Sequence, residues 1–256
     1  MITPRAKTTV KKYWFLYLLS IGILAALKYA GRITDSNALT WILTPTTRWV
    51  SILCGIPFEY LPHEGYVNHF YQFLIAPSCS GIRFMLITFL MLVFSFLYQM
   101  NDTRVGYLWF FFSATFSYIS TIFVNGIRIA VSIYLPSLLE DLGLMKGWLT
   151  PDRLHTLIGT FIYFSSLCII YPLAASIFRH AFLPTSKELT ELPSAPSLKL
   201  YIPTFWYLLF VLALPFVVRI YRKDWEGFGQ YAFLILCVCL SVTTLLRLMR
   251  LFKNNL

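Results

Sequence analysis

The chain is built as long apolar runs separated by short polar clusters. A helix needs about 20 mainly apolar residues to cross the hydrocarbon core of a bilayer. Runs close to that length recur along the 256 residues. The pattern predicts an all-α, polytopic transmembrane helical bundle of about six spans with additional interfacial helices. The six predicted spans are 13–30, 82–98, 107–124, 156–178, 205–218 and 231–246.

Two further apolar stretches are poorly suited to spanning. Residues 39–60 are interrupted by Pro45, Pro57 and the polar run 46–48, so we expect an interfacial or re-entrant segment. Residues 129–139 are too short to span. We expect them to continue the preceding helix beyond the membrane or to lie along its surface.

The segments between the spans carry their own signals. Residues 59–78 combine Pro62 and Gly65 with the β-prone sequence VNHFYQFLI, which predicts a short β-hairpin or an extended segment at the outer face. In the later loop, 140–155, Thr150 is a suitable helix N-cap and Pro151 suits the first helical position.

The chain is expected to form a single integral membrane domain over residues 1–256. The polar, Pro- and Ser-rich stretch 183–200 predicts a cytoplasmic linker, and 201–256 predicts a C-terminal helix pair.

Composition agrees with a membrane protein. The chain is 58% hydrophobic and 12% charged, which leaves too little polar surface for a water-soluble globule. Its net charge of +10 comes from Lys and Arg beside the apolar runs, so these residues are better explained as flanks that orient helices than as a nucleic-acid surface. Positive residues before the first run, with no small-residue cleavage site after it, predict an uncleaved helix and a cytoplasmic N-terminus. We expect a multi-pass protein of the bacterial inner membrane.

Three polar residues at the ends of predicted spans suggest chemistry. Cys79 precedes the second span, Arg128 follows the third and His155 precedes the fourth. The predicted topology brings all three to the outer face. A cysteine thiolate is a nucleophile that needs a base or a positive neighbour. Histidine can take and return a proton, and arginine can stabilise a thiolate or an oxyanion.

Structural roles explain the same residue types equally well. A cysteine in a membrane helix is usually a small apolar residue, and we interpret Cys168, Cys237 and Cys239 that way. An arginine at a helix end often extends to the headgroups, and a histidine there can be only a loop contact. From the residues alone, a catalytic site and these structural roles both remain open.

The ordered set PSCSGIRF, NGIRIA and HTLIGTF, each beside a predicted span, resembles the exosortase/archaeosortase family over residues 66–178. The resemblance implies a membrane cysteine protease/transpeptidase. Its substrates would be membrane-anchored proteins with a C-terminal signal: a short motif such as Pro-Glu-Pro, a hydrophobic helix and a basic cluster. Cys79 would attack the scissile carbonyl and form a thioester, His155 would act as acid and base, and Arg128 would stabilise developing charge. An acceptor nucleophile would then release the product onto a cell-surface molecule.

Several neighbours are candidate supporting residues. Asn125 shares a helix face with Arg128 if the third helix extends past the membrane, and it could orient Arg128, donate to an oxyanion or cap the helix. Arg83, one turn into the second span, is costly there unless it reaches the interface or contacts substrate. Ser80 is small and leaves room for a substrate backbone.

The segment before His155 holds two more candidates. Asp152 could orient His155 or only cap the helix, and Arg153 is a rival for the role of Arg128. Cys54 could form a disulfide with Cys79 in an oxidising compartment, which would block the nucleophile. We expect Cys54 to be buried in the interfacial segment instead.

We expect no cofactor and no metal, because the spacing of the histidines and glutamates in 59–69 matches no zinc pattern. Two other functions fit the sequence. One is a small membrane transporter or lipid-handling protein in which Arg83 and Arg128 bind an anionic substrate. The other is a non-catalytic assembly subunit of an envelope complex. Substitution of Cys79 by alanine would abolish processing by the enzyme but would be tolerated by a transporter.

Overall fold

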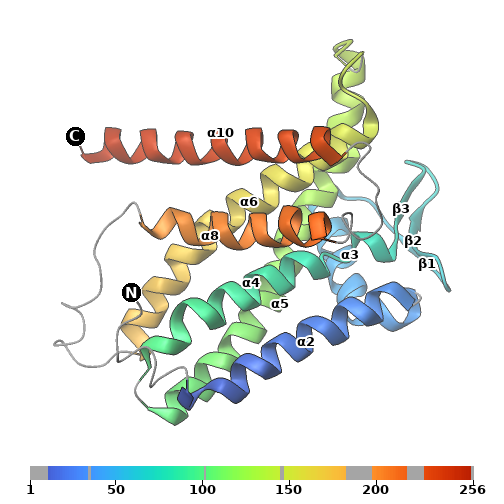
Figure 1. Ribbon diagram of the computed structural model, residues 1–256. Helices are drawn as coiled ribbons and strands as arrows, with labels where there is room; N and C mark the ends of the chain where they lie inside the picture. The colour runs from blue at the N-terminus through green and yellow to red at the C-terminus, as the bar shows by residue number, and fades with distance from the viewer. Residues whose placement is uncertain are drawn as a thin grey trace. The chain divides into compact units, whose positions relative to one another are not determined.

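The structure is a computed structural model, and it describes residues 11–33, 36–100, 102–144, 147–182, 198–217 and 228–254. Figure 1 shows a mostly helical chain with one small sheet. The helices are α2 (Trp14–Ile33), α3 (Thr40–Cys54), α4 (Ile82–Phe96), α5 (Thr103–Asp141), α6 (Pro151–Ile177), α8 (Leu198–Leu208) and α10 (Phe228–Asn254). Shorter helical turns are η1 (Ser36–Leu39), η2 (Pro77–Cys79), η3 (Leu97–Gln99), η4 (Phe178–Phe182) and η5 (Leu209–Ala213). The strands are β1 (Glu59–Leu61), β2 (Gly65–Asn68) and β3 (Phe73–Ile75).

The predicted all-α polytopic architecture is confirmed. Within the described residues, five helical segments are long and apolar enough to cross a membrane. The first predicted span forms α2, whose apolar part, Trp14–Tyr29, is shorter than these five. The five segments are Pro77–Gln99, Thr103–Asp141, Pro151–Phe182, Leu200–Val217 and Phe228–Met249.

The chain divides into two compact units. The first unit comprises Met1–Ile133 and Tyr171–Ser194, and the second comprises Tyr134–Ile170 and Ala195–Leu256. Helices α5 and α6 therefore contribute to both. The predicted linker at 183–200 lies outside the described residues up to 197, after which the chain already forms α8.

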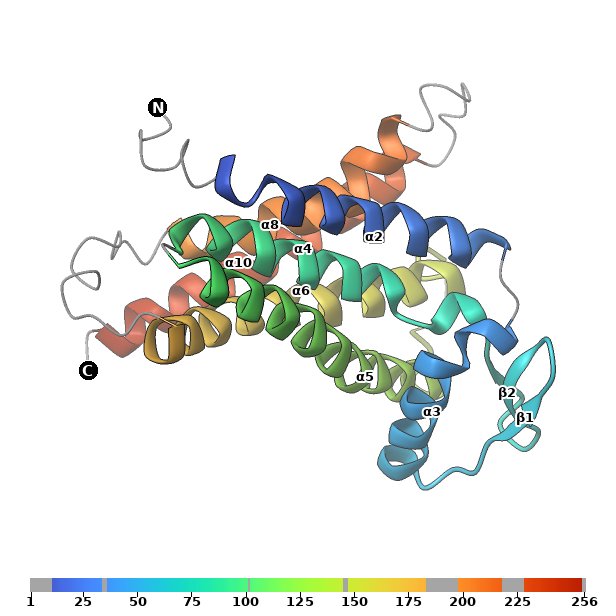
Figure 2. The same cartoon turned by 90° about the horizontal axis from the view of Figure 1, so that it is seen from below.

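Helix α4 is the enclosed helix of the first unit. Its candidate span is 89% buried, against 44% or less for the other four. Figures 1 and 2 show α2, α4 and α5 side by side. The indole of Trp109 on α5 donates a hydrogen bond of 3.2 Å to the carbonyl of Leu92 on α4. The hydroxyl of Tyr13, just before α2, donates one of 2.7 Å to the carbonyl of Asp102. Hydrogen bonds therefore reinforce apolar packing between these helices.

Helix α3 forms despite its internal proline. Pro45 has no N–H and cannot donate to the carbonyl of Trp41, one turn earlier. The hydroxyl of Tyr118 on α5 supplies that hydrogen bond instead, at 2.7 Å, and its ring stacks on Trp41. The polar and proline-containing segment is thereby held as a helix against α5.

The predicted β-hairpin is confirmed and gains a third strand. Antiparallel β1–β2 and β2–β3 pairs place Tyr66 opposite both Tyr60 and Ile75. The Tyr66 hydroxyl forms a 2.7 Å hydrogen bond with Thr44 of α3. Figure 2 shows β1 and β2 beside α3. Strand β3 then leads within a few residues to Cys79.

Helix α5 is unusually long. Its 39 residues correspond to about 58 Å at a rise of 1.5 Å per residue, well beyond the hydrocarbon thickness of about 30 Å. Residues 129–139 therefore continue the helix that precedes them, as one of the two alternatives predicted.

Candidate active site

Cys79 lies on a tight turn between a strand and a helix. Its N–H donates a 2.8 Å hydrogen bond to the carbonyl of Ala76, and the N–H of Ser80 donates one of 3.1 Å to the carbonyl of Pro77. These bonds close turn η2, and α4 begins at Ile82, three residues after Cys79. The cysteine is thus placed close to a helix N-terminus, where anions are favoured.

The glycine after this turn is required by its surroundings. Gly81 is the residue before α4 and has a φ of +73°, in the left-handed region that favours glycine. A Cβ at Gly81 would lie 2.9 Å from Cγ of Asn125 and 3.0 Å from Cγ2 of Thr121. The Cys79 turn therefore sits directly on α5.

Asn125 fixes the turn from the side of α5. It is fully buried, and its Nδ2 donates a hydrogen bond of 2.6 Å to the carbonyl oxygen of Cys79. This contact joins two residues that are 46 positions apart. The structure therefore brings together two of the predicted site residues, through the main chain of one and the side chain of the other.

Arg128 lies one turn beyond Asn125 on the same continuous helix. Its side chain is 8% exposed, and both residues belong to the buried face of α5. The predicted shared face is confirmed, because α5 runs unbroken through both positions. Arg128 therefore places a permanently charged, buried residue on α5 one helical turn from the residue that contacts Cys79.

Cys79 itself is partly buried and packs against an apolar cluster. That cluster includes Ile75 from β3, Met85 from α4 and Ile129 from α5. Cys54, at the end of α3, packs against the same cluster and is also partly buried. No disulfide joins Cys54 and Cys79 in the structure.

The other two candidates near Cys79 differ in exposure. Ser80 is buried at 6% exposure. Arg83, the second residue of α4, is exposed, so it does not face the apolar interior of the first unit. A role for either residue in binding substrate stays a prediction.

His155 and Asp152 belong to the second unit. Both are exposed in the first turns of α6, whose predicted start is confirmed: Thr150 Oγ1 accepts a 3.4 Å hydrogen bond from the N–H of Arg153, and Pro151 is the first helical residue. A meeting of His155 with Cys79 stays a prediction, as does an orienting role for Asp152.

Arg153, the predicted rival of Arg128, has its guanidinium occupied within the second unit. It donates to the carbonyl of Trp148 at 2.8 Å and to Oε1 of Gln230 at 2.9 Å. It also lies over the Trp148 ring. These contacts give Arg153 a structural role in holding the loop before α6 near the start of α10.

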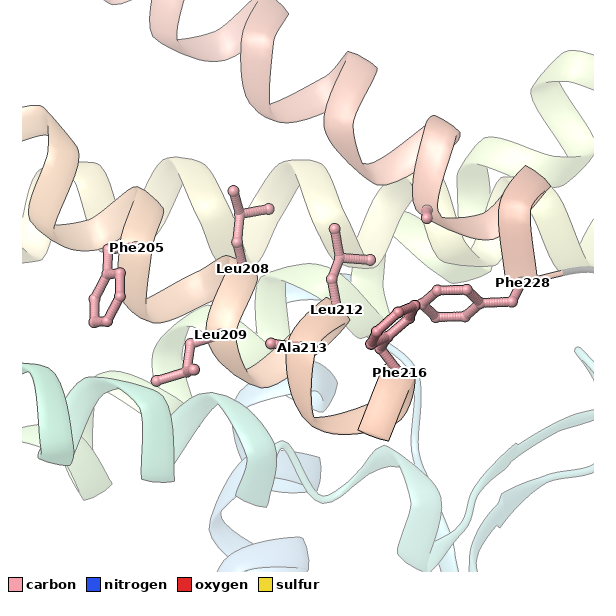
Figure 3. Close-up of a pocket in the computed structure, with 8 residues that line it drawn as sticks. Phe205, Leu208, Leu209, Leu212, Ala213, Phe216 and Phe228 are labelled. Atoms are coloured by element: carbon pink, nitrogen blue, oxygen red, sulfur yellow. The ribbon is translucent and has the colours of Figure 1, made fainter. Parts of the chain in front are cut away.

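The second unit also contains a pocket without polar lining. Figure 3 shows it between α8–η5 and α10, with the rings of Phe216 and Phe228 facing each other at 5.8 Å. No lining residue carries a charge or a titratable group, so this pocket supplies no acid, base or nucleophile. Nor do the described residues bring together three side chains that could hold a metal ion.

Sequence reasoning identified the residues of the Cys79 turn but missed its attachments. The roles of Thr121 and Gly81 in seating the turn on α5 depend on a contact between distant segments. Another missed contact is between Gly126 and Trp49, whose indole donates a 3.3 Å hydrogen bond to the carbonyl of Phe123. A glycine inside a long apolar helix was the available signal, because such glycines allow close approach of a neighbour.

Comparison with known proteins gives one match. A family model described as transmembrane exosortase matches residues 5–172, well over half of the chain. No curated protein and no solved structure matches the chain. The matched range includes the Cys79 turn, Asn125, Arg128 and His155.

Proposed function

The chain belongs to the transmembrane exosortase family, and from this membership we propose that it is a membrane cysteine transpeptidase whose nucleophile is Cys79. The family match confirms the resemblance seen in the sequence and extends it back through α2 and α3. The observation that best supports Cys79 is its main-chain hydrogen bond to buried Asn125, with Arg128 on the same face of α5.

The proposed reaction has two acyl-transfer steps. In the first, the Cys79 thiolate attacks the scissile carbonyl, and the tetrahedral intermediate expels the amine of the C-terminal fragment. His155 donates the proton that this amine needs. In the second, an acceptor attacks the thioester, His155 takes the acceptor's proton, and the Cys79 thiolate leaves.

Arg128 and the start of α4 would stabilise negative charge. The guanidinium stays protonated and can pair with the thiolate or with the oxyanion of either tetrahedral intermediate. The helix N-terminus favours the same charges. Asn125 would be a positioning residue, because its amide contacts the carbonyl of Cys79 and not the sulfur.

The expected position of α5 in the membrane supports an active site at the membrane surface. A helix that enters the hydrocarbon at Tyr107 leaves it about 20 residues later, close to Asn125 and Arg128. Charge is less costly there than at the bilayer centre. We place the N-terminus in the cytoplasm and the active site at the extracytoplasmic face.

The substrates we propose are membrane-anchored proteins with a C-terminal sorting signal: a short motif, a hydrophobic helix and a basic tail. Such a helix would diffuse in the same bilayer and pack beside the helices of the enzyme. The acceptor would be a cell-surface molecule.

Co-expression with a candidate substrate tests this function. Mass spectrometry of the purified protein should detect a thioester at Cys79, and Cys79→Ala should abolish both the adduct and substrate cleavage. Cys54→Ala is the matched control, because Cys54 packs against the same apolar cluster and should leave processing intact. Full processing by Cys79→Ala would reject the proposal and favour a transporter.

A further inference from the structure

A second pocket lies in the first unit, between α3 and the sheet. Its volume is about 470 Å³, within the range of roughly 300–1,000 Å³ that is usual for small-ligand sites. Both polar and apolar side chains line it: Thr44, Thr47, Arg48, Ser51, Ile52, Phe58 and Tyr66. We call it the α3 pocket.

One buried hydroxyl in the α3 pocket lacks a hydrogen bond. Thr47 is 3% exposed, and its Oγ1 makes no hydrogen bond with any described residue. The hydroxyl of Thr44, by contrast, forms a hydrogen bond of 2.7 Å with the hydroxyl of Tyr66. Buried polar groups in proteins nearly always have partners. A ligand oxygen that reaches this hydroxyl from the pocket would supply the missing hydrogen-bond partner.

Arg48 supplies positive charge to the same pocket. It is exposed, no ion pair among the described residues involves it, and none of the lining residues is acidic. A guanidinium beside hydroxyl donors is suited to phosphate, which it can bind with two parallel hydrogen bonds. The chemistry of the pocket therefore favours a phosphate group.

The level of the α3 pocket relative to α5 indicates which kind of molecule carries that phosphate. Trp49, next to Arg48, contacts α5 at Phe123 and Gly126, within one turn of Asn125. Tryptophan is enriched at the level of lipid headgroups. Ile52, which lines the pocket, is 73% exposed, and Leu53 beside it is exposed as well. A ligand with a phosphate and hydrocarbon chains would match both kinds of surface.

We propose that the α3 pocket binds the phosphate of a membrane phospholipid headgroup, with Arg48 and Thr47 contacting the phosphate and the acyl chains lying along Ile52 and Leu53. This binding does not depend on the chemistry of Cys79. The pocket is nevertheless connected to the Cys79 turn through the sheet. Tyr66 in the pocket wall is paired with Ile75 of β3, the strand that leads to that turn.

Native mass spectrometry of the full-length protein in detergent tests the proposal. Phosphatidylglycerol should remain bound, whereas diacylglycerol, which has the same chains and no phosphate, should not. Arg48→Gln should weaken phosphatidylglycerol binding roughly tenfold, as expected for loss of a charged hydrogen-bonding partner. Arg104→Gln removes an exposed arginine from the first turn of α5 and should leave binding unchanged.

The hydroxyl of Thr47 has its own pair of variants. Thr47→Val keeps the shape of the side chain and should weaken binding, whereas Thr47→Ser keeps the hydroxyl and should retain it. The lipid-dependent rise in melting temperature provides a second measure, with the melting temperature of each lipid-free variant as the check on folding.

Three results would overturn the proposal. Equal retention of diacylglycerol would show that the phosphate is not recognised. Equal weakening by Arg48→Gln and Arg104→Gln would show diffuse attraction to a basic protein. Complete competition by an equal concentration of inorganic phosphate would show a free-anion site in place of a lipid site.

Discussion

The side-chain amide of Asn125 donates a 2.6 Å hydrogen bond to the main-chain carbonyl of Cys79. This bond attaches the turn before α4 to the middle of α5. Its donor is fully buried, where a lost hydrogen bond is not replaced by water. The position of the proposed nucleophile therefore depends on a helix that lies far from it in sequence.

Asn125→Leu should displace the Cys79 turn, because it keeps the approximate volume but leaves the Cys79 carbonyl without this donor. We expect a loss of about 1–3 kcal/mol in the free energy of unfolding. We also expect a clear fall in the rate at which iodoacetamide alkylates Cys79 in the folded protein. Asn68→Leu is the control: Asn68 makes a similar 2.7 Å bond to the carbonyl of Pro57. It should lower stability without changing alkylation of Cys79, and equal effects on alkylation would contradict a positioning role.

Arg128→Gln should remove the positive charge that we propose stabilises the oxyanion. Loss of one such electrostatic group typically lowers turnover by about 10²–10³-fold, so we expect substrate cleavage in co-expressing cells to fall on that order. Arg128→Lys keeps the charge but not the planar fork and should retain part of the activity. The exposed Arg104→Gln variant should cleave normally. Unimpaired cleavage by Arg128→Gln would remove this residue from the proposed site.

Gly81→Ala should be more harmful than an ordinary substitution of a left-handed glycine. Gly143 is the comparison: its φ is +68°, and a Cβ there would meet nothing within 4 Å. Both variants carry a backbone strain of about 1 kcal/mol, but Gly81→Ala also pushes a methyl group against Asn125 and Thr121. We expect an additional loss of about 1–3 kcal/mol, measured by denaturant titration in mixed micelles. Equal losses at the two positions would mean that the turn does not press on α5.

Gly126→Ala should reverse the usual effect of removing glycine from a helix. That change normally stabilises a helix by about 1 kcal/mol, and Gly22→Ala in α2, where a Cβ meets nothing within 4 Å, should follow the rule. At Gly126 the new Cβ would collide with the Trp49 ring, so we expect destabilisation. A double-mutant cycle with Trp49→Leu should show strong non-additivity, whereas additive effects would exclude the contact.

The spans were predictable because each needs only a long apolar run, and the capping of α6 was predictable because Thr150 and Pro151 act on adjacent residues. Local signals of this kind are present in the sequence itself. Strands β2 and β3 were likewise indicated by the β-prone sequence VNHFYQFLI, and the turn before β2 by Pro62 and Gly65. Strand β1 precedes that turn and depends on pairing with β2 as well as on its own residues.

The site was only partly predictable. Cys79, Asn125 and Arg128 could be selected by residue type and by position at the ends of spans. The hydrogen bond between Cys79 and Asn125 could not, because hydropathy and helical periodicity carry no information on which side chain meets which turn 46 residues away. The α3 pocket was missed for a related reason: the polar run 46–48 marked an interruption of a span, and its partners come from the sheet.

The hydrogen bond from Asn125 reaches the main-chain carbonyl of residue 79, so it can still form when alanine replaces the cysteine. Cys79→Ala removes the nucleophile that we propose, so this variant should bind a substrate without cleaving it. Such a variant should hold an uncleaved substrate in place. The natural substrates of this protein can therefore be captured on this variant and identified directly from its own membrane.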